Sequence, residues 1–392
     1  MEVKPGYKQT EVGVIPEEWS IRPLGLICDV RDGTHESPRF FKDGVPFVTS
    51  KNIVNGRLDL ENVSFISRSD AVEFDKRSKV DRNDILLSMI GTIGSAVLVD
   101  CEPDFCIKNV ALIKPRKVAP TYLIHLINAP VFQKYLADNL DGGIQKFISL
   151  GKLRQLSIPL PDEPEQRAIA TALSDVDGLL GGLDRLIAKK RDLKQAAMQQ
   201  LLTGQTRLPG FHGEWEVKAI HELSHVGRGR VISHTEISKA ASPTYPVFSS
   251  QTSDSGIMGY LETYDFEGDY VTWTTDGANA GTVFARSGRF NCTNVCGTIN
   301  LHDSDHRFIS ATLGLVSQSH VSRHLGNPKL MNDVMKKIQI TIPKTRPEQT
   351  AIASVLSEMD TELAVLEQRR EKTRALKQAM MQELLTGKTR LV

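Results

Sequence analysis

The sequence predicts an α+β fold in which two globular α/β domains are separated by two long helices. The helices are expected to form an antiparallel coiled coil, with internal pseudo-twofold, cyclic symmetry. Three observations predict this fold. A segment of 45 residues occurs twice in the 392-residue chain. Apolar residues in both copies recur at the spacing of a coiled-coil seam, about 3.5 residues. The two blocks beside the repeats contain short apolar runs bounded by Gly, Asn and Asp, which is typical of strands joined by turns.

The first globular domain is expected at residues 1–161. It opens with "GVIPEEWSIRPLGLI" and closes with "LSIPLPDEPEQ". Runs such as "GVPFVTS" and "DILLSMIGTIGSAVLV" predict strands, and "APTYLIHLINAPVFQKYLADNL" has a helical pattern. We therefore expect a twisted sheet with a small helical part.

The first repeat helix, or spacer, is expected at residues 162–208. Pro164 suits the first helical position and Gly204 suits the end of the helix. Its apolar residues alternate steps of four and three, as a seam between helices requires. The predicted seam residues of this copy are Ile169, Leu173, Val176, Leu180, Leu183 and Ile187.

The second globular domain is expected at residues 209–343, from "PGFHGEWEVKAIHEL" to "IQITIPKTRPEQ". Strands are predicted in "YVTWTTDGANAGTVFARSG" and "VCGTINL", and helix in "RFISATLGLVSQSHVSRHL". Away from its edges, this block does not resemble the first. Two different recognition tasks on one symmetric frame would produce such a pattern.

The second repeat helix is expected at residues 344–392. Residues 347–391 match residues 164–208 at 26 of 45 positions without a gap. Each helix would be about 55 to 60 Å long and must bury its stripe of apolar residues against a partner. The other repeat helix is the simplest partner. There are two alternatives to pairing within one chain. Each helix packs only on its own globular neighbour, or the helices of two chains pair in a homodimer. The predicted seam residues of this copy are Ile352, Leu356, Met359, Leu363 and Leu366.

Composition limits the class of protein. The apolar fraction is 40% and the charged fraction 24%, as in ordinary soluble chains. Five cysteines without zinc-knuckle spacing predict neither disulfides nor a metal site. With no apolar span and no signal core, a cytoplasmic protein without membrane contact is expected. The net charge of +1 does not indicate nucleic-acid binding, unless basic residues cluster or partner subunits neutralise phosphates.

Motifs for catalysis are not found in the sequence. The "GKT" at residues 387–389 lacks the first glycine of a phosphate-binding loop, and the other copy has "GQT". A methyltransferase Asn/Asp-Pro-Pro-aromatic loop and a nuclease core are also missing. We therefore expect a protein that is not an enzyme and has neither catalytic residues nor a cofactor of its own.

Polar and basic residues in loops beside the predicted strands are the candidates for DNA contact. Arg, Lys, Asn and Gln bind base edges, and Ser and Thr bind phosphates. Such loops are more often simply polar. The candidates are Thr49, Ser50, Lys51, Asn52, Arg57, Lys108, Asn109, Arg228, Arg230, Ser250, Gln251, Thr252, Thr275, Asn279, Arg289, Asn291 and Asn294.

The chain consists of a globular block, a helix that begins with "PEQ" and an end with "LLTG", and this arrangement occurs twice. Over essentially the whole chain, it resembles the specificity subunits of type I restriction-modification systems. "GVIPEEW", "IPLPDEPEQRAIATAL", "LKQAAMQQLLTGQTRL" and "DGANAGTVF" carry the resemblance. It implies that the blocks are target-recognition domains for a split site in double-stranded DNA. It also implies two methyltransferase subunits, which carry S-adenosylmethionine, and motor-nuclease subunits as partners.

Two alternatives remain open. The chain could be a specificity subunit of another restriction class, whose partner fuses methyltransferase and nuclease. It could also be a coiled-coil scaffold that binds proteins and not DNA. Salt-dependent, sequence-selective DNA binding separates the scaffold from the other two.

Overall fold

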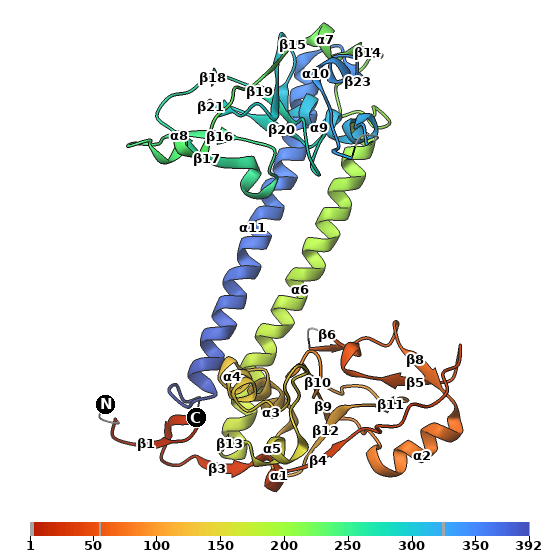
Figure 1. Cartoon of the computed structure of the whole chain (residues 1–392), viewed down its shortest axis with the longest axis vertical. Helices are drawn as coiled ribbons and strands as arrows, with labels where there is room; N and C mark the ends of the chain where they lie inside the picture. The colour runs from red at the N-terminus through yellow and green to blue at the C-terminus, as the bar shows by residue number, and fades with distance from the viewer. Residues whose placement is uncertain (1–3, 55, 324–325, 392) are drawn as a thin grey trace. The chain divides into compact units, whose positions relative to one another are not determined.

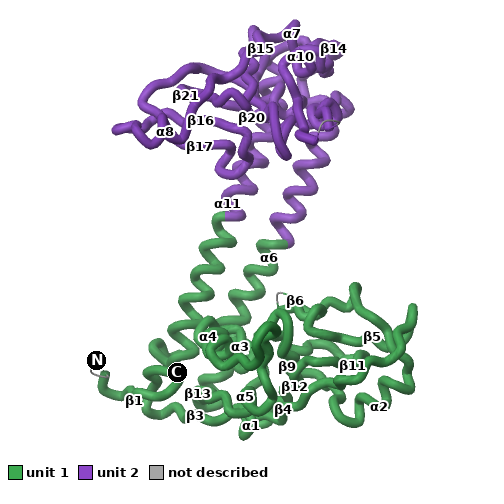
Figure 2. The backbone as a smooth tube through the Cα atoms, in the orientation of Figure 1, with its two compact units in different colours: residues 1–184, 368–392 green, residues 185–367 purple. Residues whose placement is uncertain are grey.

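The structure, a computed structural model, describes residues 4–54, 56–323 and 326–391. The limits predicted at residues 1 and 392, and the last two residues of the helical run predicted up to 325, lie outside these ranges. The chain divides into two compact units, residues 1–184 with 368–392 and residues 185–367 (Figure 2). Helices α6 (Glu163–Leu201) and α11 (Arg346–Leu384) each contribute one part to each unit.

The first unit contains a four-stranded antiparallel sheet of order β10-β9-β12-β4 and a three-stranded sheet of order β11-β5-β8 (Figure 1). Strand pairs β1-β2, β3-β13 and β6-β7 complete its described strands. The strands are β1 (Tyr7–Thr10), β2 (Gly13–Pro16), β3 (Ser20–Pro23), β4 (Cys28–Asp32), β5 (Val45–Val48), β6 (Ile53–Val54), β7 (Arg57–Leu58), β8 (Ser64–Ile66), β9 (Ile85–Ser88), β10 (Ala96–Leu98), β11 (Cys106–Ile107), β12 (Val110–Pro115) and β13 (Ser157–Leu160). The helices before α6 are α1 (Leu24–Ile27), η1 (Ser50–Asn52), α2 (Arg68–Ser78), α3 (Pro120–Ile127), α4 (Pro130–Asp138) and α5 (Leu150–Gln155).

The second unit contains two four-stranded sheets, of orders β15-β22-β19-β20 and β17-β16-β21-β18, and the pair β14-β23. Its strands are β14 (Trp215–Ala219), β15 (Ser224–Arg228), β16 (Tyr245–Phe248), β17 (Ile257–Leu261), β18 (Phe266–Glu267), β19 (Tyr270–Thr274), β20 (Val283–Arg286), β21 (Arg289–Cys292), β22 (Cys296–Leu301) and β23 (Gln339–Pro343). Its shorter helices are α7 (Ile220–Leu223), α8 (His234–Ser238), η2 (Ser253–Gly256), α9 (His306–Val316), η3 (Ser317–His320) and α10 (Asn332–Met335).

The two globular blocks share one topology, although their sequences differ. In chain order, β4, β9, β10 and β12 take the same places in their sheet as β15, β19, β20 and β22. A parallel pair follows the same plan in both blocks, β5 with β11 and β16 with β21. The duplication therefore extends through the whole unit of block and helix, and the predicted α+β class with internal symmetry is confirmed.

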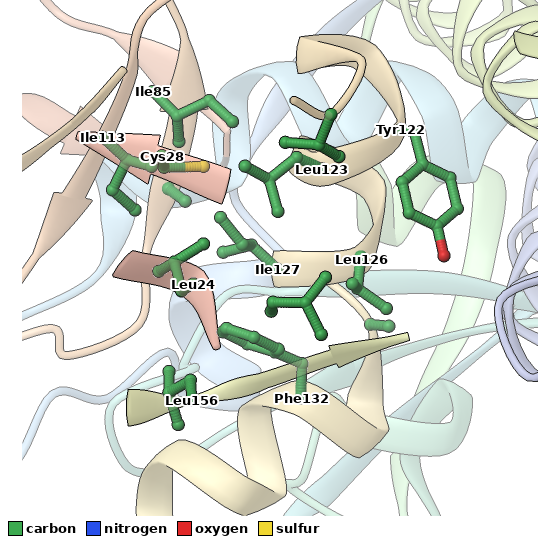
Figure 3. Close-up of a cluster of buried hydrophobic side chains, with 14 of the residues drawn as sticks. Leu24, Cys28, Ile85, Ile113, Tyr122, Leu123, Leu126, Ile127, Phe132 and Leu156 are labelled. Atoms are coloured by element: carbon green, nitrogen blue, oxygen red, sulfur yellow. The ribbon is translucent and has the colours of Figure 1, made fainter. Parts of the chain in front are cut away.

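The core of the first block continues into the repeat helices. Figure 3 shows Leu126 and Ile127 of α3 facing Leu24 and Phe132 within one cluster of buried side chains. The same cluster includes Ile169 and Leu173 of α6, and Met381, Leu384 and Leu385 at the end of α11. In the second unit, the core takes in Leu201 and Leu202 with Ile352, Ala353 and Leu356. The first two predicted seam positions of each copy thus pack into globular cores.

Helices α6 and α11 also pair directly and antiparallel. In the first unit, Asp177 pairs with Lys377 at 2.6 Å and Asp184 with Arg370 at 3.5 Å. In the second unit, Lys190 pairs with Glu362 at 2.7 Å, and Lys194 pairs with Asp360. In each unit, the residue number of the partner on α11 falls as the residue number on α6 rises. The two helices are therefore antiparallel in each unit.

Burial of the remaining seam positions varies. Leu183, Ile187 and Leu363 are buried, at 5%, 1% and 9% exposure. Val176, Leu180, Met359 and Leu366 are half-buried. A pair of helices covers only one stripe of each, so partial exposure at the rim of the seam is expected.

The repeated "PEQ" and "TRL" phrases form a clamp around a buried carboxylate, which we call the Trp–Glu–Arg clamp. In the first unit, Glu165 accepts a hydrogen bond from Trp19 Nε1 at 2.8 Å and another from Arg390. In the second unit, Glu348 accepts from Arg207 Nη2 at 2.7 Å and from Trp215 Nε1 at 3.3 Å. Each clamp joins a globular block to the start of one repeat helix and to the segment that follows the other.

Candidate DNA interface

Three chain segments meet at one edge of the first unit. Strands β5 and β11 are parallel, with Val48 beside Ile107, so their carboxyl ends lie together. The amide of Lys108 donates to the carbonyl of Val48 at 2.8 Å, and the amide of Thr34 donates to the carbonyl of Ile107 at 3.1 Å. Residues 34–35, 49–52 and 108–109 therefore gather there, and we call them the first edge.

The second unit builds a matching edge. The amide of Thr293, after β21, donates to the carbonyl of Phe248 at 2.9 Å, and the amide of Arg230 donates to the carbonyl of Cys292 at 3.1 Å. The Thr293 hydroxyl donates to the hydroxyl of Ser249 at 3.1 Å. Residues 230, 249–252 and 293–294 form what we call the second edge. The predicted DNA contacts in the loops after β5, β11, β16 and β21 are thus brought together, unit by unit.

A glycine permits this convergence in each unit. A Cβ atom on Gly33 would lie 2.4 Å from the carbonyl oxygen of Ile107, and one on Gly229 would lie 2.1 Å from that of Cys292. Real Cβ atoms do not approach so closely, because the atoms would overlap. Glycine is therefore needed where the chain leaving β4 or β15 crosses the end of the parallel pair.

A turn beside each edge joins two strands of the four-stranded sheet. Residues 88–95 link β9 to β10, and residues 274–282 link β19 to β20. The amide of Gly94 donates to the carbonyl of Ser88 at 3.0 Å, as that of Gly281 does to Thr274 at 2.8 Å. A Cβ on Gly91 would lie 3.9 Å from the Ser50 hydroxyl, which places this turn next to the first edge. Thr275 and Asn279 lie in the second turn.

Three of the predicted contacts point into the protein. The Asn52 side chain accepts from the amide of Thr49 at 2.9 Å and donates to the carbonyls of Asp59 and Asn62. Thr275 and Asn291 are both 0% exposed. Hydrogen bonds of this kind from a buried side chain fix the conformation of the loop that contains Asn52. All three side chains are buried, so the structure presents none of them at the surface.

Three predicted arginines are already paired with carboxylates. Arg230 donates to Asp265 at 2.9 Å and to Glu236 at 2.8 Å. Arg289 pairs with Glu267 at 2.9 Å, and Arg228 with Asp276 at 3.2 Å. A phosphate would have to compete with these carboxylates for the same donors.

Other candidates are open to solvent. Lys51 and Arg57 are exposed and form no ion pair within residues 4–54, 56–323 and 326–391. Arg57 lies on β7, and its hairpin is tied to the first edge by the amide of Asp59, which donates to the carbonyl of Asn52 at 2.8 Å. Thr252, Asn279 and Asn294 are exposed; Thr49, Ser50, Lys108, Asn109, Ser250 and Gln251 are half-buried. Their contact with DNA stays a prediction.

Sequence reasoning missed a polar network at the first edge. The His35 ring lies 2.7 Å from Asn109 Oδ1 through Nδ1 and 2.7 Å from Asp32 Oδ2 through Nε2. Burial alone would raise the pKa of the Asp32 carboxyl, but hydrogen bonds from His35 and Arg77 hold this pKa below its ordinary value. No signal in the sequence links residue 35 to residue 109, because their proximity depends on the crossing at Gly33.

The described residues contain neither a group of side chains that could bind a metal ion nor a helix that could span a membrane. In the described parts of the chain, no three His, Cys, Asp or Glu side chains are grouped so that they could hold a metal ion. None of the helices described there is long and apolar enough to cross a membrane.

Comparison with known proteins gives consistent matches. The family model for the type I restriction modification DNA specificity domain matches residues 16–187 and again residues 212–374. A Methanocaldococcus jannaschii protein named as the type I restriction enzyme MjaX specificity subunit is 25% identical over 98% of this chain and 97% of its own. A specificity subunit N-terminus from Mycoplasma pneumoniae is 38% identical over 35% of this chain and 73% of its own.

A solved structure has the same fold. The crystal structure of the type I restriction-modification S subunit from M. genitalium superposes with a TM-score of 0.65 at 15% sequence identity, over 98% of both chains. The two family matches together cover well over half of the sequence, one in each globular block with its helix. The chain therefore belongs to the type I restriction modification DNA specificity domain family and carries two copies of that domain.

Proposed function

We propose that this chain is the DNA sequence-specificity subunit of a type I restriction-modification complex and recognises a bipartite site in double-stranded DNA. The observation that carries the proposal is the pair of matching edges, one in each unit. Each is built on the equivalent parallel strand pair of its own unit, β5 with β11 and β16 with β21, yet the two present different side chains. Lys51 belongs to the first, with Arg57 on the adjoining hairpin, and Thr252 and Asn294 belong to the second. One frame that carries two different sets of contacts suits a site with two different halves.

The chain acts without catalysis of its own in this proposal. It docks two methyltransferase subunits, which carry S-adenosylmethionine and methylate adenine, and motor-nuclease subunits complete the restriction enzyme. A target adenine must leave the base stack before it can be methylated, and that task belongs to the methyltransferase. Family membership supports this division of labour.

Half-site variants of the full complex test the proposal. The complex of the full chain with its methyltransferase subunits is titrated with duplexes in which one or the other half-site is scrambled. Lys51→Ala with Arg57→Ala is expected to weaken binding mainly through the half-site of the first unit. The salt slope should fall by about one for each phosphate that these side chains no longer neutralise. Asn294→Ala is expected to reduce discrimination at the other half-site only.

Matched controls come from the far ends of the same sheets. Lys117 is exposed and follows β12, which pairs there with the start of β4, away from Gly33. Asn300 is exposed near the end of β22, whereas Asn294 precedes that strand. Lys117→Ala and Asn300→Ala should leave half-site binding unchanged. Equal effects of test and control variants, or binding without sequence preference, would remove support for the proposal and favour a scaffold.

A further inference from the structure

One arginine near the second edge differs from the paired arginines around it. Arg286 ends β20, and its guanidinium carbon lies 3.6 Å from the ring centre of Phe248 and 4.4 Å from that of Phe284. Its Nη2 donates to the carbonyl of Ser255 at 2.6 Å, and its Nε donates to the hydroxyl of Thr272 at 3.3 Å. Within the described residues, no carboxylate pairs with it.

Burial of this cation is unfavourable. Desolvation lowers the pKa of the Arg286 guanidinium, and the neighbouring thiols of Cys296 and Cys292 act in the opposite direction. A partly buried charge without a counterion is costly for a fold to retain. Arg228, Arg230 and Arg289 all have such counterions. Arg286 is thus a partly buried arginine of this block with which no described carboxylate pairs.

The shared fold does not require an arginine at this position. The turns 88–95 and 274–282 make equivalent backbone hydrogen bonds, so Ser88 corresponds to Thr274. By the same register, Arg286, which lies opposite Tyr270, corresponds to Val99 in the first unit. Val99 is 3% exposed and belongs to one apolar cluster with Val48, the counterpart of Phe248. An apolar residue therefore satisfies the packing in the first unit.

The loop that Arg286 contacts is strained. Asp254 and Ser255 both have left-handed backbone angles, with φ of 47° and 50°, and Gly256 follows at 85°. Consecutive left-handed residues other than glycine cost energy and tend to occur where a loop binds something. The amide of Ser249 at the second edge donates to the carbonyl of Gly256 at 2.9 Å. The strained loop therefore lies next to both the second edge and the Arg286 guanidinium.

We propose that Arg286 binds a backbone phosphate of the DNA half-site that the second unit contacts. This inference rests on the proposed function. Two of the guanidinium's N–H donors are committed to Ser255 and Thr272, which leaves the others for a ligand. The contacts with the two aromatic rings and the two hydrogen bonds already hold the guanidinium in place, so little side-chain entropy is lost on binding. Phosphates receive most hydrogen bonds in protein–DNA complexes, and the neighbouring residues 249–253 include four with hydroxyl groups.

The test compares Arg286→Gln, Arg286→Lys and Arg286→Val with the wild-type complex of the full chain and its methyltransferase subunits. Affinity for the cognate duplex is measured from about 50 to 200 mM salt, the range over which phosphate contacts dominate the salt dependence. Arg286→Gln and Arg286→Val should each weaken binding about tenfold at low salt and lower the salt slope by about one. Arg286→Lys keeps the charge and should keep the slope. Val is the residue that packs at this place in the first unit.

Arg346→Gln is the matched control, since it removes the same charge from the same unit but from an existing ion pair with Asp303, and Arg346 is not among the candidate DNA contacts. It should leave the slope unchanged. Three results would overturn the inference: an unchanged slope in Arg286→Val, an equal slope change in Arg346→Gln, or relaxed sequence preference at one base pair, which would indicate base contact. If the wild-type complex itself shows no sequence-selective binding, the proposed function fails as well.

Discussion

His125 makes the stability of the first unit depend on pH. It lies on α3, is 7% exposed, and its Nε2 is 2.9 Å from the hydroxyl of Ser174 on α6. Burial, aided by the nearby Lys377 of α11, lowers the pKa of the imidazole from 6.5 to about 4, and Asp177 of α6 opposes the shift only in part. The folded protein therefore holds this histidine neutral.

The sign of the effect follows from linkage. Below pH 6.5 the unfolded chain binds a proton that the folded protein takes up only near pH 4, so stability falls as the pH drops across that window. The loss amounts to about 3 kcal/mol. Denaturant unfolding at a series of pH values should show this slope, and His125→Gln should flatten it. An identical slope in the variant would contradict the assignment.

Gly33 provides a second test at the level of one residue. The methyl group in Gly33→Ala would meet the carbonyl of Ile107, so we expect a loss of about 1 to 3 kcal/mol and displacement of the first edge. Gly143→Ala is the control, because a Cβ there has no neighbour within 4 Å. Thermal unfolding and DNA affinity measure the two effects. Equal stability of both variants would mean that the crossing tolerates a side chain.

The coiled-coil seam can be tested on one helix. Leu183 is 5% exposed and Leu179 is 45% exposed, and both lie on α6 in the first unit. Leu183→Ala should lower the free energy of unfolding by about 2 to 5 kcal/mol, the usual range for a buried leucine. Leu179→Ala should change it by less than about 1 kcal/mol. Denaturant titration of both variants measures the two losses of unfolding free energy. A larger loss in Leu179→Ala than in Leu183→Ala would refute the predicted seam.

The Trp–Glu–Arg clamp explains why the repeats keep "PEQ" and "TRL". Glu348 is 3% exposed, so Arg207→Met would leave its carboxylate buried without a cation and cost about 3 to 5 kcal/mol. Adding Glu348→Gln should recover part of this loss, because the buried charge is then removed. A double-mutant cycle on unfolding free energies measures the coupling. Strictly additive losses would show that the two side chains do not act together.

The repeat helices were predictable because their signals are local. Periodic apolar residues and identical phrases in both copies specify two long helices, and these end at Leu201 and Leu384, close to Gly204 and Gly387. The common topology of the blocks was not predictable, because different side chains fill equivalent positions, such as Val99 and Arg286. The burial of individual polar side chains was not predictable from the sequence either. Asn52 and Lys51 are adjacent polar residues, yet one points inward and the other outward.

At the scale of the whole chain, helix length is expected to set the spacer between the half-sites. Inserting seven residues into both α6 and α11 preserves the seam and adds about 10 Å to each helix. The spacer should then grow by about three base pairs, while both half-sites stay the same. Mapping methylated sites in cells that express this variant with the methyltransferase gives the answer. Changed half-sites would contradict the division of roles between helices and blocks.

We propose that this chain confers DNA sequence specificity on a methyltransferase. The most direct test expresses it with its methyltransferase partner in a host without other adenine methylation, and maps N6-methyladenine across the genome by single-molecule sequencing. A culture without this chain is the control. We predict one split motif with a fixed spacer, methylated only when the chain is present. Methylation that is absent, or the same in both cultures, would contradict the claim.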